Sequence, residues 1–315
     1  MEIVILDAQT VTKGDIDLSV FEKLGNVTIY NLTKPDEIKE RVKYADAVIC
    51  NKTVLNESNL KGSAVKYIGL FATGYNNIDI DYCKKSGITV CNAGAYSTEA
   101  VAQHTFAFIL NYYNKIAAYT DFVADGGWLE SETFSPFVFP LSELSGKTIG
   151  IVGYGKIGRE VKKISKAFNM NVLVFTRTPK EDNDVRFVGF EELIGKSDIV
   201  TVHCPLNKDS ENMFTKEVFE KFKTGALFIN TSRGGVISEK DLAKALESGK
   251  LGGAGIDVLT FEPMKKECYL RNAKNLMITP HIAWAPIETR RRVVKIAREN
   301  LENYIEKRPT NVVVG

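Results

Sequence analysis

The sequence has few of the residues on which metal centres and disulfide frameworks depend. Its 315 residues contain three histidines and five cysteines, which are Cys50, Cys83, Cys91, Cys204 and Cys268. The number of cysteines is odd and no two of them have C-x-x-C spacing. We therefore expect neither a disulfide framework nor a zinc or other metal site, and we expect a reducing, cytoplasmic compartment.

Long apolar runs and a strong net charge are also missing. No stretch of about 18 apolar residues is present, and Glu2–Leu6 reads as a strand rather than as the start of a signal peptide. Lys and Arg number 41 and Asp and Glu number 39, which leaves a net charge of +2. Such a balance creates no broad field for nucleic acid or an anionic membrane, so we expect a soluble protein with neither partner.

Short β-branched runs alternate with amphipathic stretches along the chain, which predicts βαβ units with parallel strands. The length suits two domains, and we predict an α/β protein with two doubly wound parallel-sheet domains of the Rossmann or flavodoxin-like kind. Strands are predicted at Ile3–Leu6, Val27–Tyr30, Ala47–Cys50, Tyr67–Phe71, Ile88–Cys91, Thr148–Val152, Val172–Phe175, Ile199–His203, Ala226–Asn230, Ala254–Asp257 and Leu276–Thr279.

The pattern restarts near residue 148, which indicates that one domain is inserted into the other. We predict a substrate domain at 1–98 plus 286–315 and a dinucleotide-binding domain at 99–285. One long helix is predicted from about 97 to 123. It is followed by a loop at about 123–146 with large aromatic residues, including Trp128, Phe134 and Phe137. Because solvent-exposed loops rarely hold so many, this loop should pack either on its own chain or on a second subunit.

A glycine-rich motif of the form G-x-G-x-x-G follows the strand Thr148–Val152, and a helical pattern begins within it. Its residues are Gly153, Tyr154, Gly155, Lys156, Ile157 and Gly158. In this setting the first glycine permits a tight turn, the second admits a diphosphate and the third lets the helix approach the strand. The motif predicts a dinucleotide site with its phosphates at the helix N-terminus.

The end of the next strand bears on the choice of cofactor. An acidic residue about 20 positions after the glycine motif binds the ribose 2′-hydroxyl of NAD. Here Thr176, Arg177 and Thr178 occupy that place and no acid is present. Two hydroxyls and a guanidinium suit a 2′-phosphate, which favours NADP(H). NAD(H) stays open, because Arg177 could instead stack on the adenine.

Further polar residues stand where later strands end. Since the carboxyl ends of strands in a doubly wound sheet face the ligand crevice, these residues are candidate cofactor contacts or catalytic groups. They are His203, Cys204, Pro205, Thr231, Ser232, Arg233, Asp257, Glu262, His281 and Ala283. The third histidine, His104, lies in the middle of a predicted helix and is expected to be structural.

At these residues the chain resembles the D-isomer-specific 2-hydroxyacid dehydrogenase family. The motifs are Gly153–Gly158, Asn230–Gly235, Gly255–Val258 with Phe261–Pro263, and Pro280-His281, in the family's order along the chain. The resemblance implies hydride transfer between a nicotinamide cofactor and a 2-keto or 2-hydroxy acid. It also implies a homodimer, and the loop near Trp128 fits the family's dimer arm.

The residue types suit that chemistry. His281 would give a proton to the keto oxygen and take it back in the reverse direction. Glu262 would favour the charged imidazolium, and Arg233 would grip the substrate carboxylate with its fixed fork of donors. Arg233 and His281 would thus touch both cofactor and substrate.

The substrate carboxylate also needs donors, which two loops could supply. The resemblance assigns this role to the loop after Phe71, with Thr73, Gly74 and Tyr75, while Asn51 and Lys52 should line the same pocket. These loops resemble most closely the glycerate dehydrogenase and hydroxypyruvate/glyoxylate reductase branch. D-lactate or another D-2-hydroxy acid stays open as the substrate. So does the reading of a non-catalytic, dinucleotide-sensing protein like the C-terminal-binding corepressors, although no added tail is present.

Overall fold

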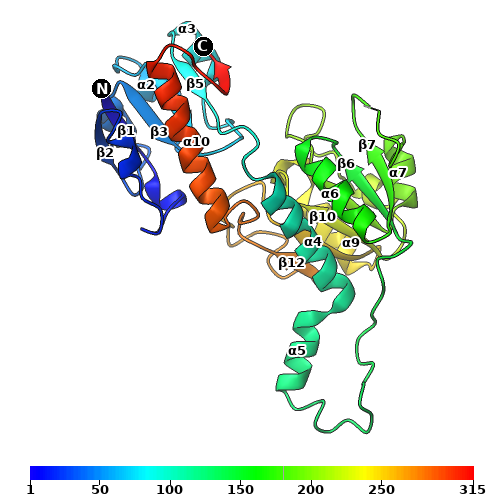
Figure 1. Cartoon of the computed structure of the whole chain (residues 1–315). Coiled ribbons are helices and arrows are strands. Elements are labelled where there is room, and N and C mark those ends of the chain that lie inside the picture. Colours follow the sequence, from blue (N-terminus) through cyan, green and yellow to red (C-terminus); the bar gives the residue numbers. More distant parts are fainter. Residues whose placement is uncertain (180) are drawn as a thin grey trace. The chain divides into compact units, whose positions relative to one another are not determined.

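The computed structural model describes residues 1–179 and 181–315 and divides them into two compact units. Unit 1 comprises Met1–Ser97 and Trp284–Gly315, and unit 2 comprises Thr98–Ala283. Each unit is built on its own sheet of mainly parallel strands with helices against it (Figure 1). The predicted fold class, α/β with two doubly wound parallel sheets, is therefore confirmed.

The sheet of unit 1 has six strands in the order β13-β5-β4-β3-β1-β2. Its strands are β1 (Glu2–Ile5), β2 (Asn26–Ile29), β3 (Ala47–Cys50), β4 (Tyr67–Leu70), β5 (Thr89–Cys91) and β13 (Val312–Val314). Its α-helices are α1 (Ile38–Val42), α2 (Glu57–Leu60), α3 (Ile80–Lys85) and α10 (Ile287–Ile305). The last strand, β13, pairs antiparallel with β5 and was not predicted.

Alternate residues of these strands fill two cores, one on each face of the sheet. Ile3 and Ile5 pack in a cluster with Val293 of α10, whereas Val4 packs in a cluster with Ile38 and other residues of the opposite face. Both faces of a parallel sheet are buried under helices, which explains why its strands read as nearly continuous apolar runs.

The sheet of unit 2 has seven strands in the order β12-β11-β10-β9-β6-β7-β8. They are β6 (Thr148–Val152), β7 (Asn171–Phe175), β8 (Arg186–Phe187), β9 (Ile199–Val202), β10 (Ala226–Asn230), β11 (Leu251–Ile256) and β12 (Leu276–Ile278). The helices are α4 (Thr98–Asn114), α5 (Ile116–Ala124), α6 (Lys156–Ala167), α7 (Phe190–Lys196), α8 (Lys216–Phe219) and α9 (Glu239–Glu247). α6 begins at Lys156, inside the glycine motif, where the sequence pattern predicts that a helix begins.

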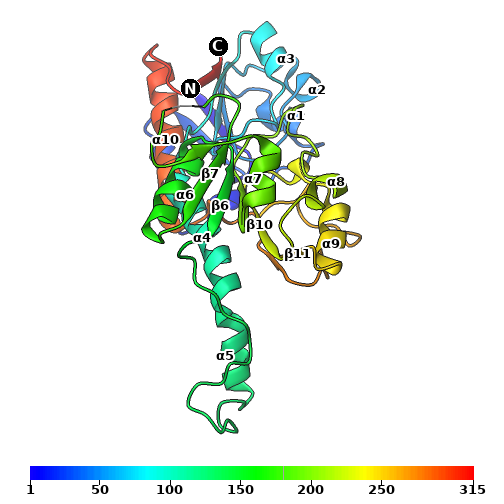
Figure 2. The same cartoon turned by 90° about the vertical axis from the view of Figure 1, so that its right-hand side faces the viewer.

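The prediction of one helix at about 97–123 is wrong in one respect, because the structure has two helices there. α4 ends at Asn114, Lys115 adopts a left-handed conformation with φ of 51°, and α5 begins at Ile116. A non-glycine residue in that region interrupts the helical hydrogen bonds. Figures 1 and 2 show α5 continuing away from the sheet of unit 2, with the following chain returning beside it to β6. We call residues 116–146 the arm.

Large side chains of the arm face solvent in the single chain. Leu129, Phe134 and Phe137 are 91%, 92% and 89% exposed. One of the two alternatives is that these aromatic residues pack on their own chain. For Phe134 and Phe137 that alternative is wrong. Some local order exists, since the indole N–H of Trp128 donates to the carbonyl of Phe134 at 3.1 Å. Across the part of the chain that the structure describes, none of the helices combines the length and the apolar character needed to span a bilayer.

Candidate active site

The predicted dinucleotide and catalytic residues all follow strands of the unit 2 sheet. The ladder from β12 to β7 is parallel throughout, so the carboxyl ends of these strands share one edge. The chain order also reverses between β6 and β9, which are neighbours in this sheet. Such a switch point opens a crevice in which doubly wound folds bind ligands.

Gly153 lies at that switch point, between the ends of β6 and β9. It has a φ of +96°, and a Cβ there would come within 2.7 Å of the Cys204 nitrogen. No other residue could make this turn without moving the neighbouring strand end, so the glycine is required by space as well as by conformation. The motif and the His203–Pro205 segment are thus brought together.

The rest of the motif forms a cradle that fits a dinucleotide diphosphate. A Cβ on Gly158 would lie 2.3 Å from the Gly153 carbonyl oxygen, so its absence lets α6 start close to β6. A Cβ on Gly155 would meet nothing within 4 Å, so this position opens onto free space. The residues after Gly155 begin a helix of 12 residues, whose free N–H groups and dipole favour an anion. Lys156 and Ile157 form its first turn.

Tyr154 and Thr231 are predicted to contact the cofactor, but their side chains make hydrogen bonds inside unit 2. Tyr154 is 7% exposed, and its hydroxyl donates to Asp182 at 2.5 Å, so its side chain packs into unit 2. Thr231 is 8% exposed and its hydroxyl lies 3.2 Å from that of Thr105. Only the backbone of these two residues is left to face a ligand.

The end of β7 carries Thr176, Arg177 and Thr178 as predicted. The Arg177 side chain is 67% exposed, and its guanidinium pairs with Asp209 at 3.1 Å. A cation at this strand end is compatible with a 2′-phosphate, but the exposed ion pair to Asp209 is a competing partner that the sequence did not reveal.

His203 supplies an independent sign that a polar ligand belongs near the switch point. One ring nitrogen, Nε2, lies 2.8 Å from the Thr201 hydroxyl, while Nδ1 is buried and has no partner among the described residues. Burial lowers the pKa of His203 to about 3, so its ring is neutral. Buried polar atoms are almost always hydrogen-bonded, so an orphaned nitrogen calls for a group supplied by a ligand or water.

His281 and Glu262 form a hydrogen-bonded pair. Nδ1 of His281 lies 2.6 Å from one carboxylate oxygen of Glu262, and the other carboxylate oxygen accepts the Leu259 N–H at 2.9 Å. The side chains are 24% and 33% exposed, so neither is sealed from solvent. With Nδ1 occupied, Nε2 is the nitrogen that can exchange a proton with a bound molecule.

A buried carboxylate holds the turn that carries His281. Asp257, 1% exposed, accepts the Thr279 hydroxyl at 2.6 Å and the N–H groups of Ile282 and Ala283 at 2.8 and 2.9 Å. Its backbone carbonyl accepts the His281 N–H at 2.7 Å. These bonds hold His281 at a φ of 55°, which is uncommon for a residue with a side chain. Asp257 and Ala283 therefore shape the site, since the Ala283 N–H is already engaged.

His104 contacts this turn, and no pattern in the sequence indicates that contact. Its Nε2 lies 2.9 Å from the Thr279 hydroxyl and 3.7 Å from Asp257. Because the Thr279 hydroxyl gives its proton to Asp257, Nε2 of His104 must donate. Burial lowers the pKa of His104, while the Asp257 charge opposes that shift. His104 therefore contacts two of the residues that hold the turn carrying His281.

Arg233 begins a short 3-10 helix, Gly234–Val236, directly after β10 and the Thr231-Ser232 pair. A Cβ on Gly234 would lie 1.9 Å from the Leu259 carbonyl carbon, so the Arg233 loop sits directly against the backbone that leads to Glu262. The guanidinium donates to the Ser232 carbonyl at 2.7 Å, and the Arg233 carbonyl accepts from Asn230. The remaining guanidinium donors are available to an anion.

The predicted substrate residues belong to unit 1 and are ordered by a residue that the sequence analysis missed. Asp7, 3% exposed, accepts the N–H groups of Asn51, Lys52 and Thr53, each at 2.8 Å, as well as the Thr53 hydroxyl. The only sequence signal for Asp7 is its place just beyond the first strand.

The second predicted loop is tied to its surroundings at both ends. The Thr73 hydroxyl donates to the Gly94 carbonyl, and Asn77 donates to the Thr53 carbonyl at 2.8 Å. Tyr75 is 42% exposed, and Gly74 lies between these anchored positions. Unit 1 therefore brings the Asn51 and Thr73 loops together by direct bonds.

Comparisons with known proteins agree with this geometry. Residues 106–283 match the family description "D-isomer specific 2-hydroxyacid dehydrogenase, NAD binding domain". The chain is 39% identical to a hydroxypyruvate reductase of Blautia hydrogenotrophica, over 99% of both chains. It is 36% identical to a glycerate dehydrogenase of Methylorubrum extorquens, over 89% of this chain and 88% of that one. Among solved structures, an acyclic imino acid reductase in complex with NADPH and D-Arg superposes with a TM-score of 0.88 at 30% identity, covering both chains fully.

Proposed function

Because this chain belongs to the D-isomer-specific 2-hydroxyacid dehydrogenase family and is an NAD(P)-dependent oxidoreductase, we propose that it interconverts hydroxypyruvate or glyoxylate with D-glycerate or glycolate. The His281–Glu262 pair carries this proposal. The support is that both residues follow strands whose carboxyl ends share one edge with the dinucleotide cradle, so Nε2 of His281 would be the nitrogen that exchanges the proton. The names of the two relatives support the choice of a small hydroxylated acid.

Each residue of the catalytic trio has one task. The bound nicotinamide cofactor supplies or accepts the hydride. Nε2 of His281 gives a proton to the keto oxygen in reduction and removes it in oxidation, while Glu262 stabilises the charged ring. Arg233 grips the substrate carboxylate with two parallel donors and polarises the neighbouring carbonyl.

Unit 1 contributes the remaining substrate contacts in this proposal. Asn51 and Lys52 offer an amide and an ammonium, and the loop of Thr73, Gly74 and Tyr75 offers backbone donors to the carboxylate. The support is the anchoring of both loops. Asp7 holds the backbone of Asn51 and Lys52, and the Gly94 carbonyl holds Thr73, so the loops lose little freedom when an anion binds.

NADP(H) is the proposed cofactor, with NAD(H) as the alternative. The remaining cofactor contacts are proposed from the segments at the carboxyl edge: the glycine motif, Thr176–Thr178, His203–Pro205 and Thr231–Arg233, with Asp257, His281 and Ala283. Replacement of Arg177 by Ala should raise KM for NADPH far more than KM for NADH. Equal changes would mean that Arg177 stacks on the adenine and reads no phosphate.

The decisive experiment follows the loss of reduced nicotinamide absorbance with hydroxypyruvate, glyoxylate and pyruvate, each with NADPH and with NADH. We expect fast turnover with hydroxypyruvate or glyoxylate and slow turnover with pyruvate. Preference for pyruvate would favour a D-lactate-type enzyme. Dinucleotide binding without turnover of any acid would favour a non-catalytic sensor like the corepressors.

A homodimer is the proposed assembly. The support is the arm, where Leu129, Phe134 and Phe137 expose apolar surface that a monomer rarely leaves in water. Sedimentation analysis should give a particle of twice the chain mass, and Phe134→Ser with Phe137→Ser should shift it to the monomer. A wild-type monomer at assay concentration would contradict the proposal.

A further inference from the structure

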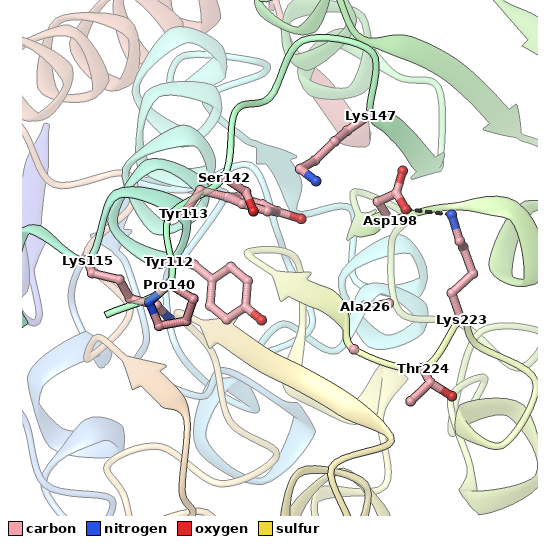
Figure 3. Close-up of a pocket in the computed structure, with 11 residues that line it drawn as sticks. Tyr112, Tyr113, Lys115, Pro140, Ser142, Lys147, Asp198, Lys223, Thr224 and Ala226 are labelled. Atoms are coloured by element: carbon pink, nitrogen blue, oxygen red, sulfur yellow. Dashed lines mark hydrogen bonds and ion pairs between the residues drawn. The ribbon is translucent and has the colours of Figure 1, made fainter. Parts of the chain in front are cut away.

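Unit 2 contains a polar pocket at the edge of its sheet opposite the dinucleotide cradle. It encloses about 250 Å³ and lies where the amino ends of β6, β9 and β10 meet the root of the arm. We call it the amino-edge pocket. The lining side chains that matter here are Tyr112, Tyr113, Lys115, Lys147, Asp198 and Lys223 (Figure 3). Every one belongs to unit 2, and the strands of the sheet separate them from the dinucleotide cradle.

The pocket carries more positive than negative charge. Three lysines face one aspartate, and that aspartate is already engaged: Asp198 pairs with Lys223 at 2.5 Å and accepts the Thr148 N–H at 2.8 Å. Lys115 and Lys147 have no carboxylate within ion-pair distance in residues 1–179 and 181–315. Their ammonium groups instead lie 4.2 and 5.1 Å from the ring centres of Tyr112 and Tyr113. The lining side chains therefore carry a net charge of +2, while the charge of Lys147 also acts on Asp198.

Tyr113 adds a hydrogen-bond donor that the folded chain does not use. The residue is 9% exposed, and its hydroxyl makes no hydrogen bond within the described part of the chain. Figure 3 shows the Tyr113 side chain and the Lys147 ammonium directed toward the same space. Burial raises the pKa of the Tyr113 hydroxyl, so it stays protonated and can only gain by donating to an acceptor. The residue lines the pocket, so an acceptor placed there would receive the hydrogen bond of its hydroxyl.

The walls of the pocket are fixed by packing. Tyr112 lies against the glycine pair of β11, where a Cβ on Gly253 would come within 2.5 Å of the tyrosine ring and one on Gly252 within 2.4 Å of its hydroxyl. The two tyrosine rings meet edge to face at 5.1 Å. Aromatic walls held in this way give a ligand an apolar surface beside the charged groups, as small-molecule sites generally do.

We propose that the amino-edge pocket binds a small phosphorylated organic anion through the ammonium groups of Lys115 and Lys147 and the hydroxyl of Tyr113. A phosphate monoester has nearly two negative charges at neutral pH and three acceptor oxygens, which match two free lysines and one free hydroxyl. The volume, about 250 Å³, is smaller than that of most ligand sites, roughly 300–1,000 Å³, and admits only a compound of few carbons. Since Lys115 and Lys147 flank the ends of the arm, such a ligand would bridge its two attachment points.

The test is calorimetry on the full-length protein with its dinucleotide site saturated, so that added phosphate cannot bind in the glycine cradle. The probes are glycerol 3-phosphate, inorganic phosphate and glycerol. We expect one site per chain for glycerol 3-phosphate, weaker binding of inorganic phosphate because it lacks the carbons that touch the tyrosines, and none of glycerol.

Variants then assign the site. Lys147→Met keeps the side-chain length and should weaken glycerol 3-phosphate about tenfold, the loss of one charge-assisted contact. Tyr113→Phe should weaken it by a smaller factor. Lys274→Met, an exposed lysine outside the pocket, is the matched control and should change nothing. Thermal melting and keto-acid reduction should be unchanged in all three, which separates this proposal from the catalytic one.

Three outcomes would overturn the proposal. The first is that glycerol 3-phosphate gives no saturable heat, which is the result expected if a second copy of this chain fills the pocket. The second is binding that Lys147→Met and Tyr113→Phe leave intact. The third is inorganic phosphate binding as tightly as glycerol 3-phosphate, which would leave no role for the organic part.

Discussion

Replacing Asp257 by Asn tests whether the turn that carries His281 is held by charge. One oxygen of Asp257 accepts the Thr279 hydroxyl and the Ile282 N–H, and the other accepts the Ala283 N–H. An amide has one acceptor oxygen, so its NH₂ group must face at least one of these donors. The variant therefore loses one or more hydrogen bonds to a charged group and gains a contact between two donors.

The magnitude follows from the same bonds. A hydrogen bond to a charged group contributes roughly 1.5–3 kcal/mol, and an unpaired buried N–H adds a further cost of about 1–3 kcal/mol. We expect the free energy of unfolding to fall by about 2.5–6 kcal/mol, so the variant stays folded where the stability of the domain is in the upper part of the usual range of roughly 5–15 kcal/mol. A folded variant with a loosened turn should misplace His281, and a shift of about 1 Å can cost on the order of 10²-fold in kcat.

The assay is steady-state reduction of hydroxypyruvate together with thermal unfolding. Asp257→Asn should lower kcat by about 10²-fold with a smaller change in KM for the dinucleotide, because Asp257 is one of many proposed cofactor contacts and the diphosphate cradle lies on other strands. Asp241→Asn is the control, since Asp241 accepts a long bond from the Lys216 N–H. A variant that is less stable but retains near-normal kcat would refute the reasoning and leave Asp257 a merely structural residue.

Four further predictions use the same kinds of measurement. His281→Ala should lower kcat by about 10²–10⁴-fold and weaken dinucleotide binding much less, because the glycine cradle is untouched; near-normal turnover would exclude the acid–base role. Asp7→Asn should raise KM for the keto acid and lower the melting temperature, because the loop at residues 51–53 loses acceptors. Burial lowers the pKa of His203 from 6.5 to about 3, so between these pH values the unfolded chain binds a proton that the folded chain excludes. The free energy of unfolding should therefore fall as the pH drops from 6.5 to about 3, and it should fall less steeply in His203→Gln. Hydrogen bonds from Arg290 lower the pKa of Asp15. Arg290→Met should therefore be less stable than the wild type in chemical unfolding at neutral pH, and this difference in unfolding free energy should shrink as the pH falls below about 3.8.

The parallel strands could be predicted because burial on both faces leaves a continuous apolar run. The antiparallel strand β13 and the two-residue strand β8 could not, since each is short and exists only through its partner. The break between α4 and α5 also has no local signal, because Lys115 is neither glycine nor proline. The chain continues in a helical pattern on both sides of it.

The site divides in the same way. The glycine motif and the polar residues at strand ends are local features, so the sequence was sufficient to find them. The partners that hold them are not local: Asp7 binds residues 44 to 46 positions away, and His104 meets Thr279 across 175 positions. Their roles depend on how the strands are ordered in the sheet, which no local pattern encodes. Similarly, Asp209 was not expected beside Arg177, because their side chains come from different strand ends.

The two buried carboxylates reveal one device used in both units. Asp7 follows β1 and accepts backbone N–H groups from the loop at residues 51–53, a candidate substrate loop. Asp257 follows β11 and accepts backbone N–H groups from the turn that carries His281. Burying a carboxylate is costly unless it is fully hydrogen-bonded, so such a residue persists only where several donors converge on it. That requirement makes the loop conformation all-or-none, because a displaced loop would leave the charge unsatisfied. The same physics that makes these aspartates costly to bury therefore fixes the loops that carry the candidate substrate contacts and His281.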